Sequence, residues 1–298
     1  MKTYRIIYID AFTSQPFSGN PCAVLPEADG LTDGQMQKIA METNLSETAF
    51  VLPSDRACIK VRYFMPHKEI PFAGHPTIAT AVMLAQEGVI PNDGPVAVAD
   101  FEFNIGVLPV EIHRDAAGQP RKAVMTQPKP TFGRVVAMDD VVPCIGLDEK
   151  DLLPNVPLQV VSTGVPFLIV PVIDMAVLRK VQVDQAVFQS LLKAIGVDAA
   201  YLFCRGGMAP DADAHGRLYT SRAGTEDPFT GSAVGCMGAY MAHHGLRPGL
   251  VYTVEQGHIM GRPGNGTVEI IGSAERIASV KVGGCAVRTM EGFINAPI

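Results

Sequence analysis

Two stretches of the chain are apolar on nearly every side of a helix, residues 78–85 and 233–241. A helix that is apolar all round must be buried all round. Neither stretch approaches the ~20 residues that a membrane span needs. We therefore expect two core helices, over about 76–87 and 233–244, each followed by a glycine. Their Ala, Gly and Cys residues would let surrounding strands approach closely.

Around these helices the chain is divided into short segments rich in Ile, Val and Tyr, which favours strands. Two amphipathic helices are also predicted, over 33–42 with Thr32 as N-cap and over 185–195 behind Asp184. The predicted strands cover 4–11, 22–25, 47–52, 58–64, 96–101, 106–112, 122–126, 159–162, 167–171, 200–204 and 217–221, with hairpin-like strands between 251 and 282 and a last strand near 286–292 that we expect to complete the first half.

The chain repeats itself once. Four segments of the first half recur in the same order in the second, and the offset rises slowly from 145 to 157 residues, as small loop insertions would produce. The matched segments are Gly19–Val24 with Gly164–Ile169, Ser46–Leu52 with Asp198–Cys204, Arg62–Phe64 with Arg217–Tyr219, and Pro71–His75 with Pro228–Ser232.

This duplication predicts an α+β fold of two pseudo-symmetric halves, each a curved β-sheet wrapped around its own buried helix. We expect the first half to contain 1–127 plus a C-terminal strand at about 285–298, and the second to contain 128–284. The active site would lie in the cleft between them. A chain of 298 residues suits two domains of similar size.

Composition narrows the possible partners. The net charge is −6 and no Lys/Arg cluster stands out, so we expect neither a nucleic-acid partner nor an anionic membrane. The apolar run near the start, four residues long, is too short for a signal peptide. The six cysteines are scattered without a C-x-x-C pair. We therefore expect a soluble cytoplasmic protein with free thiols.

Each predicted core helix begins after a small glycine-containing loop, 72–77 in the first half and 229–233 in the second. Helix N-termini carry unpaired N–H groups and partial positive charge. A glycine there lets a ligand approach the backbone. If the two N-termini converge, they suit a small carboxylate or enolate substrate. Ordinary helix capping is the alternative for either loop alone.

Three ionisable residues break the repeat: Glu47, His75 and Asp227. Their counterparts in the other half are Ala199, Ser232 and Ile70. Asymmetry of this kind is what a duplicated scaffold needs in order to act on an asymmetric substrate. Glu47 lies in an apolar stretch, which predicts a raised pKa suited to proton transfer. The structural alternatives are a carboxylate at the start of a strand for Glu47, a turn residue for Asp227 and a helix cap for His75.

The motifs around these residues resemble those of the PhzF family. Asn44-Leu45-Ser46-Glu47-Thr48 resembles N-x-S-E-T, Phe64 to Pro76 resembles F-T-P-x-x-E-x-x-F-A-G-H-P, and Glu226 to Ala233 resembles E-D-P-x-T-G-S-A. Further matches are Phe17 to Pro21, Gln256-Gly257 and Gly261-Arg262-Pro263. The resemblance extends from about residue 5 to residue 290.

The resemblance implies a diaminopimelate epimerase-like fold, usually in a homodimer. It also implies isomerisation of a small carboxylic acid without metal or organic cofactor, as in the conversion of trans-2,3-dihydro-3-hydroxyanthranilate in phenazine biosynthesis. By position, Glu47 would be the proton shuttle and His75 and Asp227 its catalytic partners. The substrate-binding residues would be Gly74, Gly231, Ser232, Asn20 and Ser46.

Related racemases use two thiols at the helix N-termini. We place those positions at Ala73 and Phe229, which argues against two-thiol chemistry. The chain also departs from the family pattern at Met65, Ser221 and Phe229. These departures leave the shape of the substrate open.

Other site types have little support in the sequence. The seven His residues form no H-E-x-x-H or H-x-H pattern, so we expect no metal site. No dinucleotide or Walker loop is present, so we expect no nucleotide cofactor. Cys22 is a possible nucleophile, although a packed thiol is the simpler interpretation. Two functional alternatives stay open: a Glu/Asp-based racemase or epimerase of an amino or hydroxy acid, and a small-carboxylate binding protein without activity.

Overall fold

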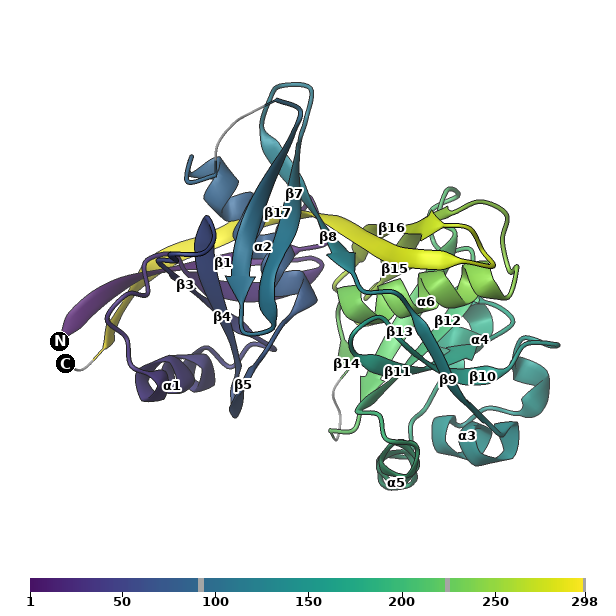
Figure 1. Ribbon diagram of the computed structural model, residues 1–298. Helices are drawn as coiled ribbons and strands as arrows, with labels where there is room; N and C mark the ends of the chain where they lie inside the picture. The colour runs from purple at the N-terminus through teal and green to yellow at the C-terminus, as the bar shows by residue number, and fades with distance from the viewer. Residues whose placement is uncertain (91–93, 223–225, 297–298) are drawn as a thin grey trace. The chain divides into compact units, whose positions relative to one another are not determined.

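The computed structural model describes residues 1–90, 94–222 and 226–296, which form two compact units (Figure 1). Unit 1 comprises Met1–Met125 with Gly283–Ile298, and unit 2 comprises Thr126–Val282. The chain leaves unit 1 once and returns to it along its last strand.

Unit 1 is mostly strands, with one helix on its surface and one in its centre. Its elements are β1 (Lys2–Ala11), β2 (Asn20–Leu25), α1 (Asp33–Thr43), β3 (Thr48–Leu52), β4 (Ile59–Met65), β5 (Lys68–Ile70), α2 (Gly74–Gln86), β6 (Val96–Phe103), β7 (Gly106–Arg114), β8 (Pro120–Gln127) and the C-terminal part of β17 (Ile277–Ala296).

The strands of unit 1 close into a ring around α2. The pairings run from β17 to β1, β2, β3, β4, β6, β7 and β8, and β8 pairs back with β17. The central helix packs against β1, β2, β3 and β7. Twelve of its residues, Gly74 through Ala85, are buried, as its uniformly apolar sequence requires. The prediction of a curved sheet around a buried helix is confirmed for this unit.

Unit 2 repeats the plan with more surface helix. Its elements are β9 (Thr131–Val136), α3 (Met138–Ile145), a 3₁₀ turn (Glu149–Asp151), β10 (Leu158–Ser162), β11 (Pro166–Pro171), α4 (Met175–Lys180), α5 (Gln185–Ile195), β12 (Ala199–Arg205), β13 (Ala214–Thr220), β14 (Glu226–Asp227), α6 (Gly231–His243), β15 (Val251–Gln256), β16 (Gly264–Gly272) and the start of β17.

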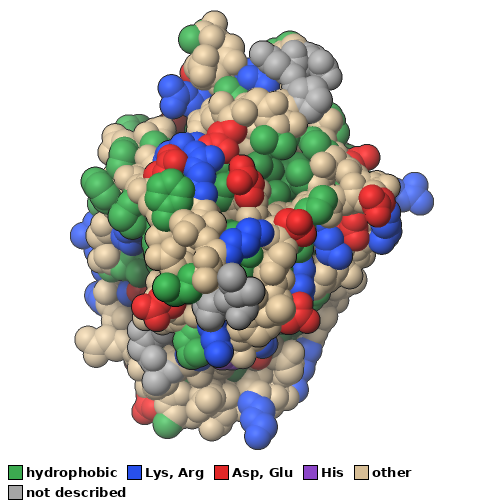
Figure 2. Space-filling view, turned by 90° about the vertical axis from the view of Figure 1, so that its left-hand side faces the viewer, with side chains coloured by type: hydrophobic (Ala, Val, Ile, Leu, Met, Phe, Trp, Pro, Cys, Tyr) green, Lys and Arg blue, Asp and Glu red, His purple; other side chains and the backbone are tan. Residues whose placement is uncertain are grey.

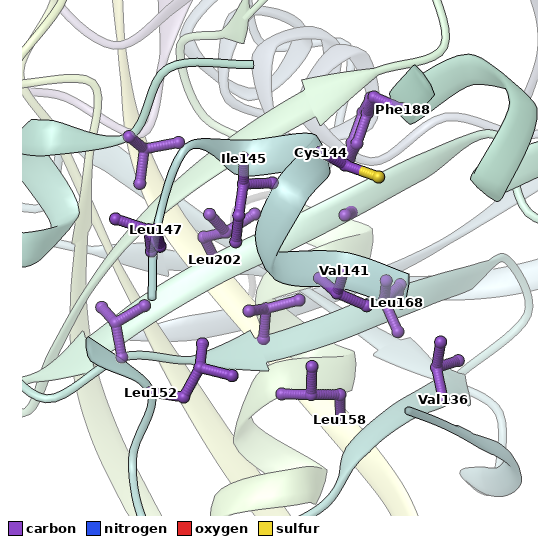
Figure 3. Packing of buried hydrophobic residues seen from close by; sticks show 14 of the residues in the cluster. Val136, Val141, Cys144, Ile145, Leu147, Leu152, Leu158, Leu168, Phe188 and Leu202 are labelled. Carbon is purple, nitrogen blue, oxygen red and sulfur yellow. The ribbon is translucent and has the colours of Figure 1, made fainter. Parts of the chain in front are cut away.

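Helix α6 is the core helix of unit 2 and packs against β10, β11 and β16. Eleven of its thirteen residues are buried. A second apolar cluster joins α3 and α5 to β11 and β12; it includes Cys144 and Phe188 from the helices and Leu168 and Leu202 from the strands (Figure 3). Unit 2 therefore has apolar packing against α6 and against the surface helices.

The same pairings occur in the same order in both units. Parallel pairs β2/β3 and β11/β12 are each followed by an antiparallel partner, β4 or β13. Strand β4 then pairs with β5 and β6, and its counterpart β13 pairs in the same way with β14 and β15. The four matched sequence segments therefore correspond to a shared internal topology.

Several short elements were not predicted: β5, β9, β14, α3 and α4. Four of them have six residues or fewer, and α3 contains Pro143, so hydrophobic periodicity carries little signal there. The separate strands expected near 282 and 286–292 are one strand, β17, drawn yellow in Figure 1. It pairs with β1 from Lys2 to Ala11, and its C-terminal part, from Gly283, belongs to unit 1.

The surface mixes both signs of charge. On the face in Figure 2, Lys and Arg side chains are interspersed with Asp and Glu. Among the described residues, no helix is both long and apolar enough to cross a membrane. All six cysteines are free thiols.

Candidate active site

The start of α2 leaves its first N–H groups without a side-chain cap. The N-cap is Ala73, in an extended conformation, and it has no side chain that could cap the helix. The helix begins at Gly74, two residues earlier than predicted, so Pro76 is its third residue rather than its first. This costs no hydrogen bond, because the first four N–H groups of a helix have no intrahelical partner.

His75 is the second residue of α2 and is buried, with 6% exposure. Burial lowers its pKa to about 3, against the opposing effect of a hydrogen bond to the Pro21 backbone. Proline has no N–H, so the imidazole donates to the Pro21 carbonyl. Nε2 has no hydrogen-bond partner. The donor is therefore Nδ1, and Nε2 carries a lone pair.

That lone pair lies beside Glu47. Nε2 of His75 is 3.5 Å from Oε2 of Glu47, and both side chains are largely buried. The two groups do not form an ion pair, because a histidine with its pKa lowered to about 3 is neutral at pH 7. Glu47 immediately precedes β3. The structure therefore brings together the two unit 1 residues for which a catalytic role was predicted.

Asn20, Ser46 and Gly74 lie around this pair. Asn20 is fully buried at the start of β2, one residue before the Pro21 carbonyl that holds His75. Ser46 is half-buried beside Glu47, and Gly74 is the buried first residue of α2. Ser46 and Gly74 are thus chain neighbours of the pair, and Asn20 precedes the residue whose carbonyl accepts from His75.

Cys22 is also close to this group, but its thiol is inert. It is fully buried, and burial, followed by the negative charge of Glu47, raises its pKa well above the ordinary value. A thiol that stays protonated is a poor nucleophile. The packed-thiol interpretation therefore fits Cys22 better than a nucleophilic role.

The hydroxyl groups of Thr77 and Tyr63 hold the start of α2 by hydrogen bonds. Thr77 Oγ1 donates to the Ala73 carbonyl at 2.6 Å, and Tyr63 OH lies 2.8 Å from Thr77 Oγ1. Because the threonine proton is used, Tyr63 donates to Thr77. Sequence analysis missed both residues; the signal available was a Tyr at an inward position of β4 and a Thr three residues into the helix.

In unit 2 the loop before α6 is organised by Asp227, Thr230 and Gln256. Thr230 is the N-cap, and its hydroxyl donates to the Asp227 carboxylate in a very short hydrogen bond rather than capping the helix. The amide of Gln256 donates from Nε2 to the Asp227 carbonyl at 2.8 Å and accepts from the Thr230 N–H at 3.2 Å. Gln256 is fully buried, so these bonds are shielded from water.

A second buried glutamine holds the first turn of α6. Gln127 Nε2 donates to the Gly231 carbonyl at 3.0 Å, and its Oε1 accepts from the Thr163 hydroxyl at 2.6 Å. Gly231 is buried and Ser232 is half-buried, as the first two residues of α6. The three unit 2 residues predicted from sequence, Asp227, Gly231 and Ser232, thus lie on one loop and helix start. The predicted cleft between the halves stays a prediction.

One sequence alignment was wrong. The N-cap that corresponds to Ala73 is Thr230, whereas Phe229 precedes it and is fully buried. Phe229 therefore belongs to the core of unit 2 and does not correspond to Ala73. Neither N-cap is a cysteine, so the argument against two-thiol chemistry is unchanged.

Each loop is also held by an arginine that sequence analysis did not assign to the site. Arg62 of β4 forms two hydrogen bonds to Glu69 of β5, at 2.8 and 2.7 Å. Arg217 of β13 forms two to Glu226 of β14, both at 2.8 Å. Bidentate pairs of this kind fix geometry well. The repeat itself was the available signal, because both arginines and both glutamates recur at nearly the same offset.

The chain is similar along its whole length to curated proteins named as uncharacterised isomerases. A relative from Clostridium acetobutylicum is 35% identical over 297 residues, which covers 96% of each chain. A relative from Bacillus subtilis is 32% identical and covers 91% of this chain and 92% of its own.

Solved structures agree on the fold. The PhzF-family phenazine biosynthesis protein of Bacillus anthracis superimposes with a TM-score of 0.90 at 32% identity, over 99% of this chain and 100% of that one. A hydroxyproline epimerase from Agrobacterium vitis has a TM-score of 0.66 at 14% identity over 99% of this chain and 91% of that one, which shows a shared fold alone. The family model described as phenazine biosynthesis-like protein, PhzC-PhzF, matches residues 9–292, and the chain belongs to that family.

Proposed function

We propose that this protein is a cofactor-independent isomerase that moves a proton within a small cyclic or unsaturated carboxylic acid. Its relatives from Clostridium acetobutylicum and Bacillus subtilis are named as isomerases, and the similarity covers more than nine tenths of each chain. Both facts support the reaction class. The residue geometry supports the way in which the proton moves.

The observation that carries the proposal is the Glu47–His75 pair. A carboxyl oxygen and a neutral imidazole nitrogen face each other at 3.5 Å in a largely buried setting. Both atoms accept hydrogen bonds when unprotonated, so a proton that reaches Glu47 finds an acceptor already in place. A structural ion pair would instead need a charged histidine, which burial of His75 disfavours.

The proton balance is closed within the active site. The Glu47 carboxylate takes a proton from a carbon of the substrate, and the electron pair moves into the adjoining conjugated system. The new Glu47 carboxylic acid then donates to His75 Nε2 until it returns the proton to another carbon of the same molecule. No proton, electron or group is gained or lost overall, which is what an isomerisation requires.

Each helix start could bind the negative charge of such a substrate. Neither α2 nor α6 has a side-chain cap, so their first N–H groups are not used by the helix or by a capping residue. We assign the substrate carboxylate, and the charge that develops on deprotonation, to N–H groups of this kind, with Gly74, Gly231 and Ser232 as the local contacts. Asn20, Ser46 and Asp227 would orient the molecule.

The test is exchange of substrate protons with deuterated water, measured by NMR on a panel of small unsaturated carboxylic acids. The wild-type protein should incorporate deuterium and shift a double bond. Glu47→Gln keeps the shape and removes the base, so exchange should fall by about 10²–10⁴. Glu42→Gln, an exposed carboxyl on α1, is the matched control and should exchange at the wild-type rate.

Equal exchange in wild type and Glu47→Gln would contradict the proposal. Deuterium that enters a stereocentre without movement of a double bond would instead identify an epimerase. That second candidate is favoured by one observation, a Pseudomonas aeruginosa structure described as a predicted epimerase, which is 26% identical with a TM-score of 0.82 over 99% of this chain and 100% of that one.

A further inference from the structure

Unit 2 contains a group of metal-ligating side chains that the proposed isomerisation does not use. His215 of β13 and Glu255 of β15 are direct partners in the parallel pairing of these strands, and His258 follows β15 by two residues. His215 is fully buried, Glu255 is 5% exposed and the His258 side chain is 22% exposed. Two imidazoles and one carboxylate thus meet at the edge of the core, close to solvent on one side.

The separations match a first coordination sphere. Nδ1 of His215 is 3.2 Å from Oε2 of Glu255, and one ligand atom from each of the three residues lies within 4.8 Å of the others. Tetrahedral zinc with bonds of about 2.0–2.1 Å places neighbouring ligand atoms roughly 3.3 Å apart. Nε2 of His258 lies 3.9 Å from Oε1 of Glu255, so this partly exposed side chain has to move inward to complete the coordination sphere.

The carboxylate is oriented in advance. Oε2 of Glu255 accepts from the Met208 N–H at 2.6 Å, and Oε1 accepts from the Ala209 N–H at 3.0 Å. Burial alone would raise the pKa of Glu255, but these two bonds, together with the hydrogen bond to His215 and the nearby His258, lower it. A carboxylate offers about four lone-pair sites; Oε2 uses its two for Met208 and His215, and Oε1 keeps one for a further ligand.

The buried imidazole already points one nitrogen at the carboxylate: Nδ1 of His215 is 3.2 Å from Oε2 of Glu255. Without a metal its Nδ1–H donates to Glu255; with one, the proton sits on Nε2 and Nδ1 becomes the ligand, with no net proton released. Arg179 adds positive charge near His215, so affinity must come from ligand bonds rather than from net charge.

We propose that His215, Glu255 and His258 bind one divalent transition-metal ion of the zinc type, with water at the remaining position. Two imidazoles and a carboxylate suit zinc better than the all-oxygen surroundings that magnesium and calcium prefer. The ion would fasten the 206–212 loop to the end of β15. Gln256, next to Glu255, holds Asp227 and Thr230, so the ion would stiffen the support of that loop without entering the proton transfer.

The test is titration of the metal-free protein with zinc chloride by calorimetry, together with thermal unfolding. One zinc ion should bind per chain and raise the unfolding temperature, whereas magnesium chloride should produce neither effect. His258→Ala should weaken binding at least tenfold. Its side chain is partly exposed, so this variant should fold, which far-UV circular dichroism checks.

His113→Ala is the matched control. His113 faces Glu111 at 3.3 Å, nearly the same distance as between His215 and Glu255. Among the described residues, however, this pair has no third ligand beside it of the kind that His258 provides. Zinc binding in His113→Ala should equal that of wild type. Absence of stoichiometric binding in wild type, or equal affinities in wild type and a folded His258→Ala, would overturn the proposal. Because both readouts measure binding and stability, they stand apart from the outcome for Glu47.

Discussion

The side-chain amide of Gln256 donates to the backbone carbonyl of Asp227 and accepts from the backbone N–H of Thr230. One buried side chain therefore satisfies both ends of the loop that carries the unit 2 candidate residues. This loop is short, and its shape depends on a residue 29 positions further along the chain.

We predict that Gln256→Leu loosens this loop. Leucine fills the volume but leaves a buried carbonyl and N–H without their partner, which costs about 1–3 kcal/mol. Urea unfolding should show that loss, and the exchange rate of the substrate should fall as well. Gln189→Leu is the control, because Gln189 is an exposed residue of α5. Equal stability of the two variants would argue against a supporting role for Gln256.

Burial of His75 predicts a specific pH dependence of stability. Its pKa is lowered from 6.5 to about 3 in the folded protein, so the unfolded chain binds the proton more tightly. The stability contributed by neutral His75 is complete above pH 6.5 and is lost progressively as the pH falls toward 3. The slope from one proton is about 1.4 kcal/mol per pH unit.

Urea unfolding at pH 7.0, 6.0 and 5.0 measures this slope. His75→Gln, which cannot be protonated, should reduce it, whereas His113→Gln, at a partly exposed position, should leave it unchanged. A slope that is the same in wild type and His75→Gln would show that the imidazole is not held neutral by burial.

The Arg217–Glu226 ion pair of unit 2 should contribute more to the free energy of unfolding than an ion pair at the surface does. Arg217 is 9% exposed and Glu226 16% exposed, and the guanidinium also donates to the Leu178 carbonyl. Glu226→Gln leaves the arginine charge buried without its partner, and we expect a loss of about 3 kcal/mol. Lys150→Met removes one partner of the exposed Lys150–Asp148 pair and should change the unfolding midpoint by no more than the error of the measurement.

Glycine at position 235 is required by close packing. A Cβ there would lie 1.9 Å from Oε1 of Gln127, the residue that holds the Gly231 carbonyl. Gly235→Ala should therefore cost about 1–3 kcal/mol and reduce activity together with stability. Gly34→Ala is the opposite case. A Cβ at this position would meet no atom within 4 Å, and α1 gains a better helix former. It should stabilise the protein by about 0.5–1 kcal/mol. Thermal unfolding of both variants decides the comparison.

Much of the fold was predictable because its signals are local or repeated. The core helices were recognisable from apolar residues on every face, and α5 was predicted with its exact bounds because Asp184 caps an amphipathic segment. The helix starts at Gly74 and Gly231 were missed by two residues, since a helix that begins on a glycine after an uncapped residue has no sequence signal. The short strands β5 and β14 form because they pair with β4 and β13, and their own residues carry no strand pattern long enough to recognise.

The candidate site divides in the same way. By itself the sequence identified the candidate residues: Glu47, His75 and Asp227 stand out because a duplication shows where its two copies differ. Only the tertiary structure decided the protonation state of His75 and the hydrogen bonds that hold the Asp227 loop. His75 is neutral because it is buried, and the shape of the Asp227 loop depends on Gln256. The approach of His215 to Glu255 depends on the register of two parallel strands. Hydrogen bonding, desolvation and strand register act between residues that are distant in the chain, so no local pattern can encode them.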